Sequence, residues 1–203
     1  MWVRSFGKIV IAGWRVVAVS IALSMATAFG ITLLVTPVYE SRTQMFLSTS
    51  GSTYSSDTYV GNLYSVQAIP AYAELVTNQL LTSKVIADLA LDLTPAELAD
   101  KVTMTYSPET VVFDIVATDT SPELARDIAN TMATELRAVV ADLEAPGDGE
   151  PPSVTLKVRS VAEVPDAPIS PNTVALLAWG AAVGLLIGTA LMLVRHRSRG
   201  NAR

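Results

Sequence analysis

The residue types that most often carry out catalysis are scarce in this 203-residue chain. It contains no cysteine and one histidine, His196, which excludes thiol nucleophiles, cysteine-based zinc sites, iron–sulfur clusters and disulfides together. A carboxylate pair could still cleave or transfer sugars, and Asp114 and Asp119 are candidates by position. However, 19 acidic residues are scattered along the chain, and Asp114 alternates with Phe113 and Ile115, which places it on a solvated strand face. We therefore predict no catalytic residue, no metal site and no cofactor.

Charge and composition narrow the kinds of partner. The net charge is −5, which argues against a nucleic-acid binder that depends on basic charge. The acidic residues form no compact Asp/Asn/Gly loop of the kind that binds calcium. Hydrophobic residues make up 50% of the chain and charged residues only 16%, whereas soluble domains carry about a quarter charged residues. Part of the chain is therefore expected to lie in lipid.

Two uncharged apolar runs, Val16–Val35 and Val174–Val194, lie near the two ends. A helix of about 20 residues spans the roughly 30 Å hydrocarbon layer of a bilayer. Buried core helices are the first alternative, but they rarely have uncharged runs of this length. A cleaved signal peptide, with a cut near Ala26–Ala28, is the second alternative, but the apolar run continues past that point. Both runs are predicted to be transmembrane helices, the first an uncleaved anchor.

The basic residues at the two ends predict the orientation. Three precede Val16 and four follow Val194, with no acidic residue among them, whereas the segment between the runs has a net charge of −12. Because basic flanks mark the cytoplasmic side, we expect both termini inside a cell (inner) membrane protein with two spans. The predicted order is a cytoplasmic N-terminus (1–15), a transmembrane helix (16–35), an extracytoplasmic domain (36–173), a second transmembrane helix (174–194) and a cytoplasmic tail (195–203).

Residue periodicity predicts an α+β fold for the extracytoplasmic domain. Alternation favours strands at 38–48, 102–106, 111–117 and 154–159, in a small antiparallel or mixed sheet. Amphipathic helices are expected at 68–90, broken near Leu81–Ser83, at 95 onward after the capping box of Thr94, and from Ser121-Pro122 to Leu143. Loops are expected at 48–61 and 145–153. The order is strand, helices, strand, strand, helix, strand.

Two further patterns surround the second apolar run. Segment 164–172 contains Pro165, Pro168, Pro171 and Asn172, and its prolines suit a stiff, extended connector. Within the run, Gly180, Gly184 and Gly188 line one helix face, which favours close helix packing in lipid, although glycine is also common in membrane helices. The partner could be the first run near Ser20, Ser24 and Thr27, a neighbouring subunit or another protein. We expect Gly184→Leu to weaken an oligomer and Gly184→Ala to be mild.

This arrangement resembles the Wzz-type chain length determinants, also called polysaccharide co-polymerases. The residues that carry the likeness are Tyr39-Glu40-Ser41, the segment from Thr118-Asp119-Thr120-Ser121-Pro122 to Asn130, and Val164–Asn172. The domain is short, so the chain is most similar to the compact Gram-positive capsular polysaccharide adaptors. No single motif is highly specific, and the likeness depends on order and spacing through most of the chain.

The resemblance implies a non-catalytic membrane protein, present as a homo-oligomer. Such a protein would regulate the chain length, polymerisation or export of a capsule or exopolysaccharide, beside a membrane glycan polymerase that extends lipid-linked polysaccharide. The alternative is a transmembrane adaptor that activates a cytoplasmic tyrosine kinase. The chain has no G-x-x-x-x-G-K-[ST] loop and no tyrosine cluster after Val194, so that kinase would be a separate protein.

Overall fold

The computed structural model describes residues 2–49, 68–108, 110–145 and 154–200. The chain divides into two compact units, which we describe separately. Residues 1–37 and 170–203 form a helix pair, and residues 38–169 form a domain. The predicted loops at 48–61 and 145–153 lie almost entirely outside the described residues.

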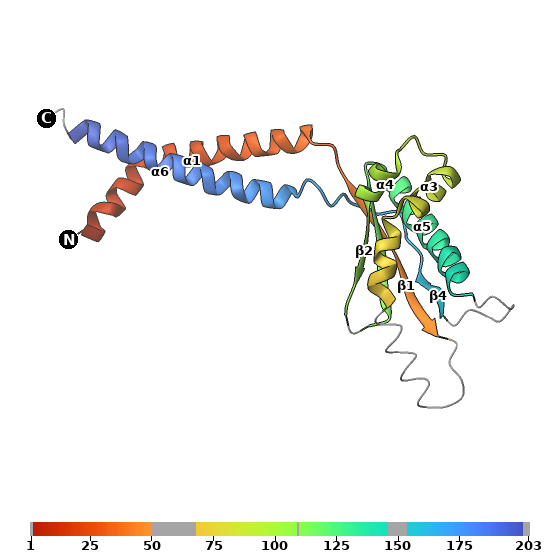
Figure 1. The fold of residues 1–203 in the computed structure, drawn as a ribbon. Coiled ribbons are helices and arrows are strands. Elements are labelled where there is room, and N and C mark those ends of the chain that lie inside the picture. The colour runs from red at the N-terminus through yellow and green to blue at the C-terminus, as the bar shows by residue number, and fades with distance from the viewer. Residues whose placement is uncertain (1, 50–67, 109, 146–153, 201–203) are drawn as a thin grey trace. The chain divides into compact units, whose positions relative to one another are not determined.

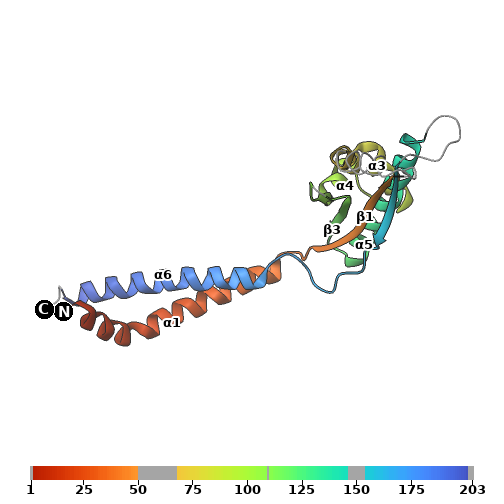
Figure 2. The ribbon, with the colours of Figure 1, turned by 90° about the horizontal axis from the view of Figure 1, so that it is seen from below.

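The helix pair consists of α1 (Trp2–Leu34) and α6 (Thr173–Gly200), which lie side by side (Figures 1 and 2). Both are long and apolar enough to cross a membrane, over Trp14–Leu34 and Thr173–Val194. Their large apolar side chains are mostly exposed, with Leu34 87% and Trp179 72% accessible. A buried core helix would hide such side chains, so the first alternative reading of the apolar runs does not apply.

The domain contains a four-stranded antiparallel sheet with the strand order β2-β3-β1-β4. The strands are β1 (Tyr39–Thr49), β2 (Val102–Tyr106), β3 (Val112–Asp119) and β4 (Val154–Ser160). Helix α5 (Pro122–Leu143) packs across β1, β3 and β4, and α4 (Pro95–Lys101) packs against β2 and β3. Helix α3 (Gln79–Asp88) and a helical segment at 68–76 complete this side. The predicted mixture of helices with a small sheet is confirmed, and every strand pair is antiparallel.

Alternation explains the core of the sheet. Phe113, Ile115 and Ala117 of β3 are buried, as are Met45 and Leu47 of β1, because alternate residues of a strand face the same side. They pack against the apolar stripe of α5, where Ile128, Met132, Leu136 and Val139 are buried at the predicted helical spacing.

Apolar periodicity does not guarantee burial at the ends and irregular points of these elements. Leu143 is 63% exposed, and Tyr106 and Val158 are each 37% exposed. Leu143 and Tyr106 are the last residues of α5 and β2, and Val158 lies next to an irregularity in the pairing of β1 with β4. Periodicity describes which way a side chain points, but it does not indicate where the opposing layer ends.

The predicted break in the helix at 68–90 is also misplaced. The interruption falls at residues 77–78, and Leu81 and Thr82 are buried inside α3. Asn78 is responsible, because its side-chain Oδ1 accepts a hydrogen bond from the N–H of Leu80 at 2.8 Å and caps α3. The capping box of α4 is confirmed, with Thr94 and Glu97 bonded reciprocally.

Candidate functional site

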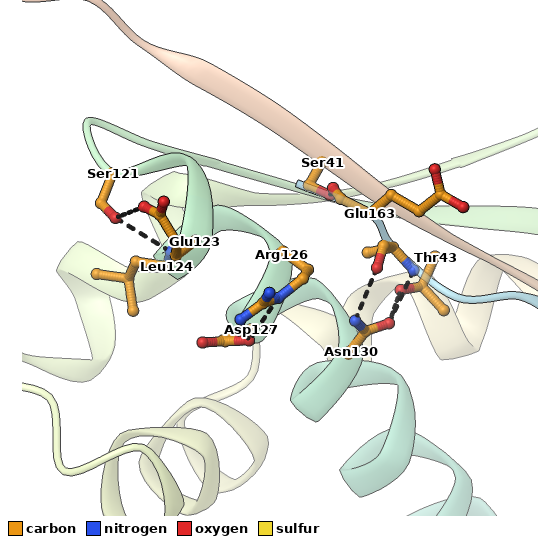
Figure 3. Close-up of polar contacts among 10 residues, drawn as sticks. Ser41, Thr43, Ser121, Glu123, Leu124, Arg126, Asp127, Asn130 and Glu163 are labelled. Carbon is orange, nitrogen blue, oxygen red and sulfur yellow. Dashed lines mark hydrogen bonds and ion pairs between the residues drawn. The ribbon is translucent and has the colours of Figure 1, made fainter. Parts of the chain in front are cut away.

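The two segments that connect the domain to the helix pair are joined to each other inside the domain. Strand β1 follows α1, and residues 161–169 follow β4 and lead toward α6. We call the residues that join these segments the clasp: Ser41 and Thr43 of β1, Asn130 of α5, and Ala162 and Glu163 of the exit segment. Figure 3 shows Asn130 directed from α5 toward Thr43.

Asn130 is the centre of the clasp. Its Oδ1 accepts hydrogen bonds from Thr43 Oγ1 at 2.8 Å and from the N–H of Ala162 at 2.9 Å, while its Nδ2 donates to the carbonyl of Ala162 at 3.1 Å (Figure 3). One side-chain amide therefore satisfies both backbone groups of Ala162, as a neighbouring strand would. Ala162 is only 4% exposed, so water cannot readily replace these bonds.

Two more hydrogen bonds continue the connection toward the helix pair. Ser41 Oγ donates to the carbonyl of Glu163 at 2.6 Å, and the N–H of Ile169 donates to the carbonyl of Val38 at 2.8 Å. Ser41 and Thr43 are buried polar residues on the inward face of β1, and buried hydroxyls require partners. Strand β1 and the exit segment are therefore hydrogen-bonded to each other close to where the chain enters and leaves the domain.

The start of α5 is held by a second polar group. Asp119, 6% exposed, accepts from Lys101 Nζ at 2.6 Å and from the N–H of Ser121 at 3.0 Å. Burial alone would raise the pKa of Asp119, but the bonds from Lys101, Ser121 and Thr120 together hold it below its usual value. Ser121 Oγ in turn accepts from the N–H of Leu124 and caps α5. This group therefore sets where α5 begins, eight residues before Asn130.

The two candidate catalytic carboxylates do not form a pair. Asp114 and Asp119 are five residues apart on β3, so they face opposite sides of the sheet and lie roughly 17 Å apart along the strand. Glycosidase pairs need separations of about 5–9.5 Å. Asp114 instead accepts from Gln44 at 2.9 Å and lies 3.7 Å from Arg42. Within the described residues, no group of three or more His, Asp or Glu side chains could hold a metal ion.

The three glycines of α6 lie where its backbone approaches α1 of the same chain. A Cβ at Gly180 would lie 3.0 Å from Ala28 Cβ, at Gly184 2.6 Å from Ile21 Cα, and at Gly188 2.8 Å from Val17 Cα. Ser20 and Ser24 are at this contact.

Thr27, grouped with these serines by the sequence, is exposed and donates instead to the carbonyl of Leu23. Because the atoms that oppose Gly184 belong to backbone, the structure favours a disruptive effect of Gly184→Ala over the mild effect expected from the sequence.

The proline-rich segment forms no helix or strand between residues 161 and 169. Pro168 is exposed and Pro165 is half-buried. Asn172 has a local role, because its Oδ1 accepts from the N–H of Ala175 at 3.0 Å in the first turn of α6.

The sequence patterns indicate the prolines and glycines, but they indicate no role for Asn130 or Ser41. A signal was present for β1, where Ser41 and Thr43 occupy inward positions of a strand and so must find buried partners.

Comparison with known proteins found similar chains. Residues 4–89 match the family model described as chain length determinant protein, Wzz. The probable capsular polysaccharide biosynthesis protein YwqC of Bacillus subtilis is 27% identical over 186 residues, which cover 88% of this chain and 72% of that protein. The capsular polysaccharide biosynthesis protein CpsC of Streptococcus agalactiae is 25% identical over 180 residues, 87% of this chain and 74% of that protein.

The fold has a counterpart among solved structures. A full-length bacterial polysaccharide co-polymerase matches with a TM-score of 0.50 and 10% identity, over 95% of this chain and 97% of that chain. Both apolar helices and the domain are thus included in the match. The resemblance of this chain to the Wzz-type chain length determinants, first indicated by its sequence, is therefore confirmed.

Proposed function

We propose that this chain is a non-catalytic membrane protein that controls the chain length of a cell-surface polysaccharide. The observation that carries the proposal is the match to a co-polymerase over almost the full length of both chains, together with relatives named for capsular polysaccharide biosynthesis. In this role the chain would act as a homo-oligomer beside a membrane glycan polymerase, on lipid-linked polysaccharide. Its domain, in which the candidate carboxylates are too far apart to act together, would supply surface and position rather than chemistry.

Length control can be tested by deleting the gene and sizing the surface glycan. The deletion strain should still make polysaccharide, because in this role the polymerase would be a separate protein, but with a broadened or shifted length distribution. Expression of the intact chain should restore the original distribution. An unchanged length distribution would contradict the proposal.

The alternative role is that of an adaptor for a separate cytoplasmic tyrosine kinase. It predicts a different result from the same strain: unchanged glycan lengths with altered tyrosine phosphorylation. Helix α6 continues past the end of the apolar run at Val194 to Gly200, and in the proposed topology this segment is what such a kinase would contact.

The proposed topology has both termini in the cytoplasm and the domain outside. It is supported by seven basic and no acidic residues in the two flanks. Fusions of a cytoplasm-only reporter to each terminus should both be active in cells. An inactive C-terminal fusion at normal expression would contradict the two-span arrangement.

A further inference from the structure

Ile169 is an exposed apolar residue at the last position of the domain. Its side chain is 51% accessible, and it lies four residues before Thr173, where α6 begins. Its N–H donates to the carbonyl of Val38. Val38 lies three residues after Val35, the last residue of the first apolar run. Both connections to the helix pair therefore meet at Ile169.

Chain geometry keeps Ile169 close to any membrane that α6 crosses. Four residues span at most about 14 Å, since an extended chain covers about 3.5 Å per residue. The polar interfacial layer on each side of the hydrocarbon is roughly 5–7 Å thick, from the difference between total and hydrocarbon thickness. An isoleucine in this position can reach the boundary between headgroups and acyl chains.

The backbone around Ile169 is suited to an environment with little water. Pro168 and Pro171 have no N–H, and the N–H of Ile169 is already bonded to Val38. Unbonded backbone donors are costly near lipid, and Pro168, Ile169 and Pro171 present none. Glu163 and Asp166, in contrast, are exposed carboxylate residues in the same connector, and carboxylates remain in water.

We propose that Ile169 is inserted into the lipid interface and that Asp166 stays in water, so that the exit segment passes from water into the interface between these two residues. The inference depends on the proposed membrane placement of α6. The hydrogen bond from Ile169 to Val38 would hold this contact at a set position relative to β1.

The absence of native cysteine allows a direct test with single nitroxide labels in the full chain, reconstituted in phosphatidylcholine–phosphatidylglycerol vesicles. The variants are Ile169→Cys and Asp166→Cys, with Leu186→Cys as the lipid reference and Leu143→Cys as the water reference. Leu143 is 63% exposed on the domain and Leu186 69% exposed on α6. We measure the collision rate with oxygen relative to that with a water-soluble nickel chelate, because oxygen concentrates in lipid.

The ratio at position 169 should be several-fold higher than at 166 and 143, and closer to the ratio at 186. If 169 matches 143 while 186 remains lipid-like, the inference fails and the membrane placement of α6 stands. If 186 is also water-like, the membrane placement itself fails. A lipid-like ratio at 166 would overturn the proposed boundary between Asp166 and Ile169.

Discussion

Gly184→Ala is expected to disrupt the pairing of α1 with α6, although it adds a single methyl group. The new Cβ would lie 2.6 Å from Ile21 Cα and 2.9 Å from the carbonyl oxygen of Ser20, whereas carbon atoms in favourable contact are about 3.5–4.0 Å apart. Both opposing atoms are backbone, so no side chain can rotate away and the helices must separate. Overpacking of this kind costs about 1–3 kcal/mol.

Gly30→Ala is the matched control within the same helix pair. A Cβ at Gly30 meets nothing within 4 Å, and alanine is favoured over glycine in a helix interior by about 1 kcal/mol. Unfolding of the full chain in mixed detergent and SDS micelles, followed by circular dichroism, should show a lower midpoint for Gly184→Ala. Gly30→Ala should give an unchanged or higher midpoint. Equal midpoints for the two variants would show that the close approach at Gly184 does not stabilise the pair.

The same contact changes what Gly184→Leu is expected to do. The sequence suggested that a larger residue would weaken an oligomer first, because the glycine face could belong to a neighbouring subunit. In the structure that face is occupied by α1 of the same chain, so the first loss is expected in the helix pair of each single chain. Loss of oligomer would then be a secondary effect.

These glycines illustrate how far the sequence could predict the site. A spacing of four residues places Gly180, Gly184 and Gly188 on one helix face, and small residues indicate that something approaches closely. Neither property identifies the partner, because several surfaces could fit the same face. The identity of α1 as the neighbour depends on tertiary packing.

In the domain, too, local patterns in the sequence predict single helices and strands but not how distant segments pair. Strand alternation and helix periodicity predicted β3 and α5, since each pattern is local. The pairing of β1 with both β3 and β4 could not be read from those patterns, because it joins residues that are 66 to 80 positions apart for β3 and 105 to 116 positions apart for β4. The position of the helix break has a local cause, since Asn78 caps α3 and so starts the helix at Gln79.

The role of Asn130 cannot be read from the sequence, because its hydrogen-bond partners are far away in the chain. Its partners Thr43 and Ala162 are 87 and 32 residues away, and an asparagine on α5 is, by sequence, an ordinary helix surface residue. Only the fold shows that one amide connects β1, α5 and the segment that leads to α6. The clasp therefore depends on all three elements being in place.

Replacing Asn130 with leucine, which has a similar size, should destabilise the domain by about 2–5 kcal/mol. Three hydrogen bonds are lost together, and each buried polar group left without a partner costs about 1–3 kcal/mol. The effect should be greatest locally, since the N–H and carbonyl of Ala162 lose the amide that pairs with both. Hydrogen–deuterium exchange in residues 161–169 should therefore accelerate more than exchange in the core strand β3.

Thr134→Ala provides the comparison one turn further along α5. Its hydroxyl also forms a hydrogen bond, to the backbone carbonyl of Asn130, but the residue is exposed, and surface changes of this kind are usually within about 0.5 kcal/mol. In urea unfolding, the midpoint of Thr134→Ala should be close to that of the parent chain, and the midpoint of Asn130→Leu should be lower. If Asn130→Leu unfolds like Thr134→Ala, and exchange at 161–169 is unchanged, the exit segment is held by other contacts and Asn130 does not secure it. If both midpoint and exchange change as expected, one side chain on α5 controls how firmly the connector toward α6 is attached to the domain.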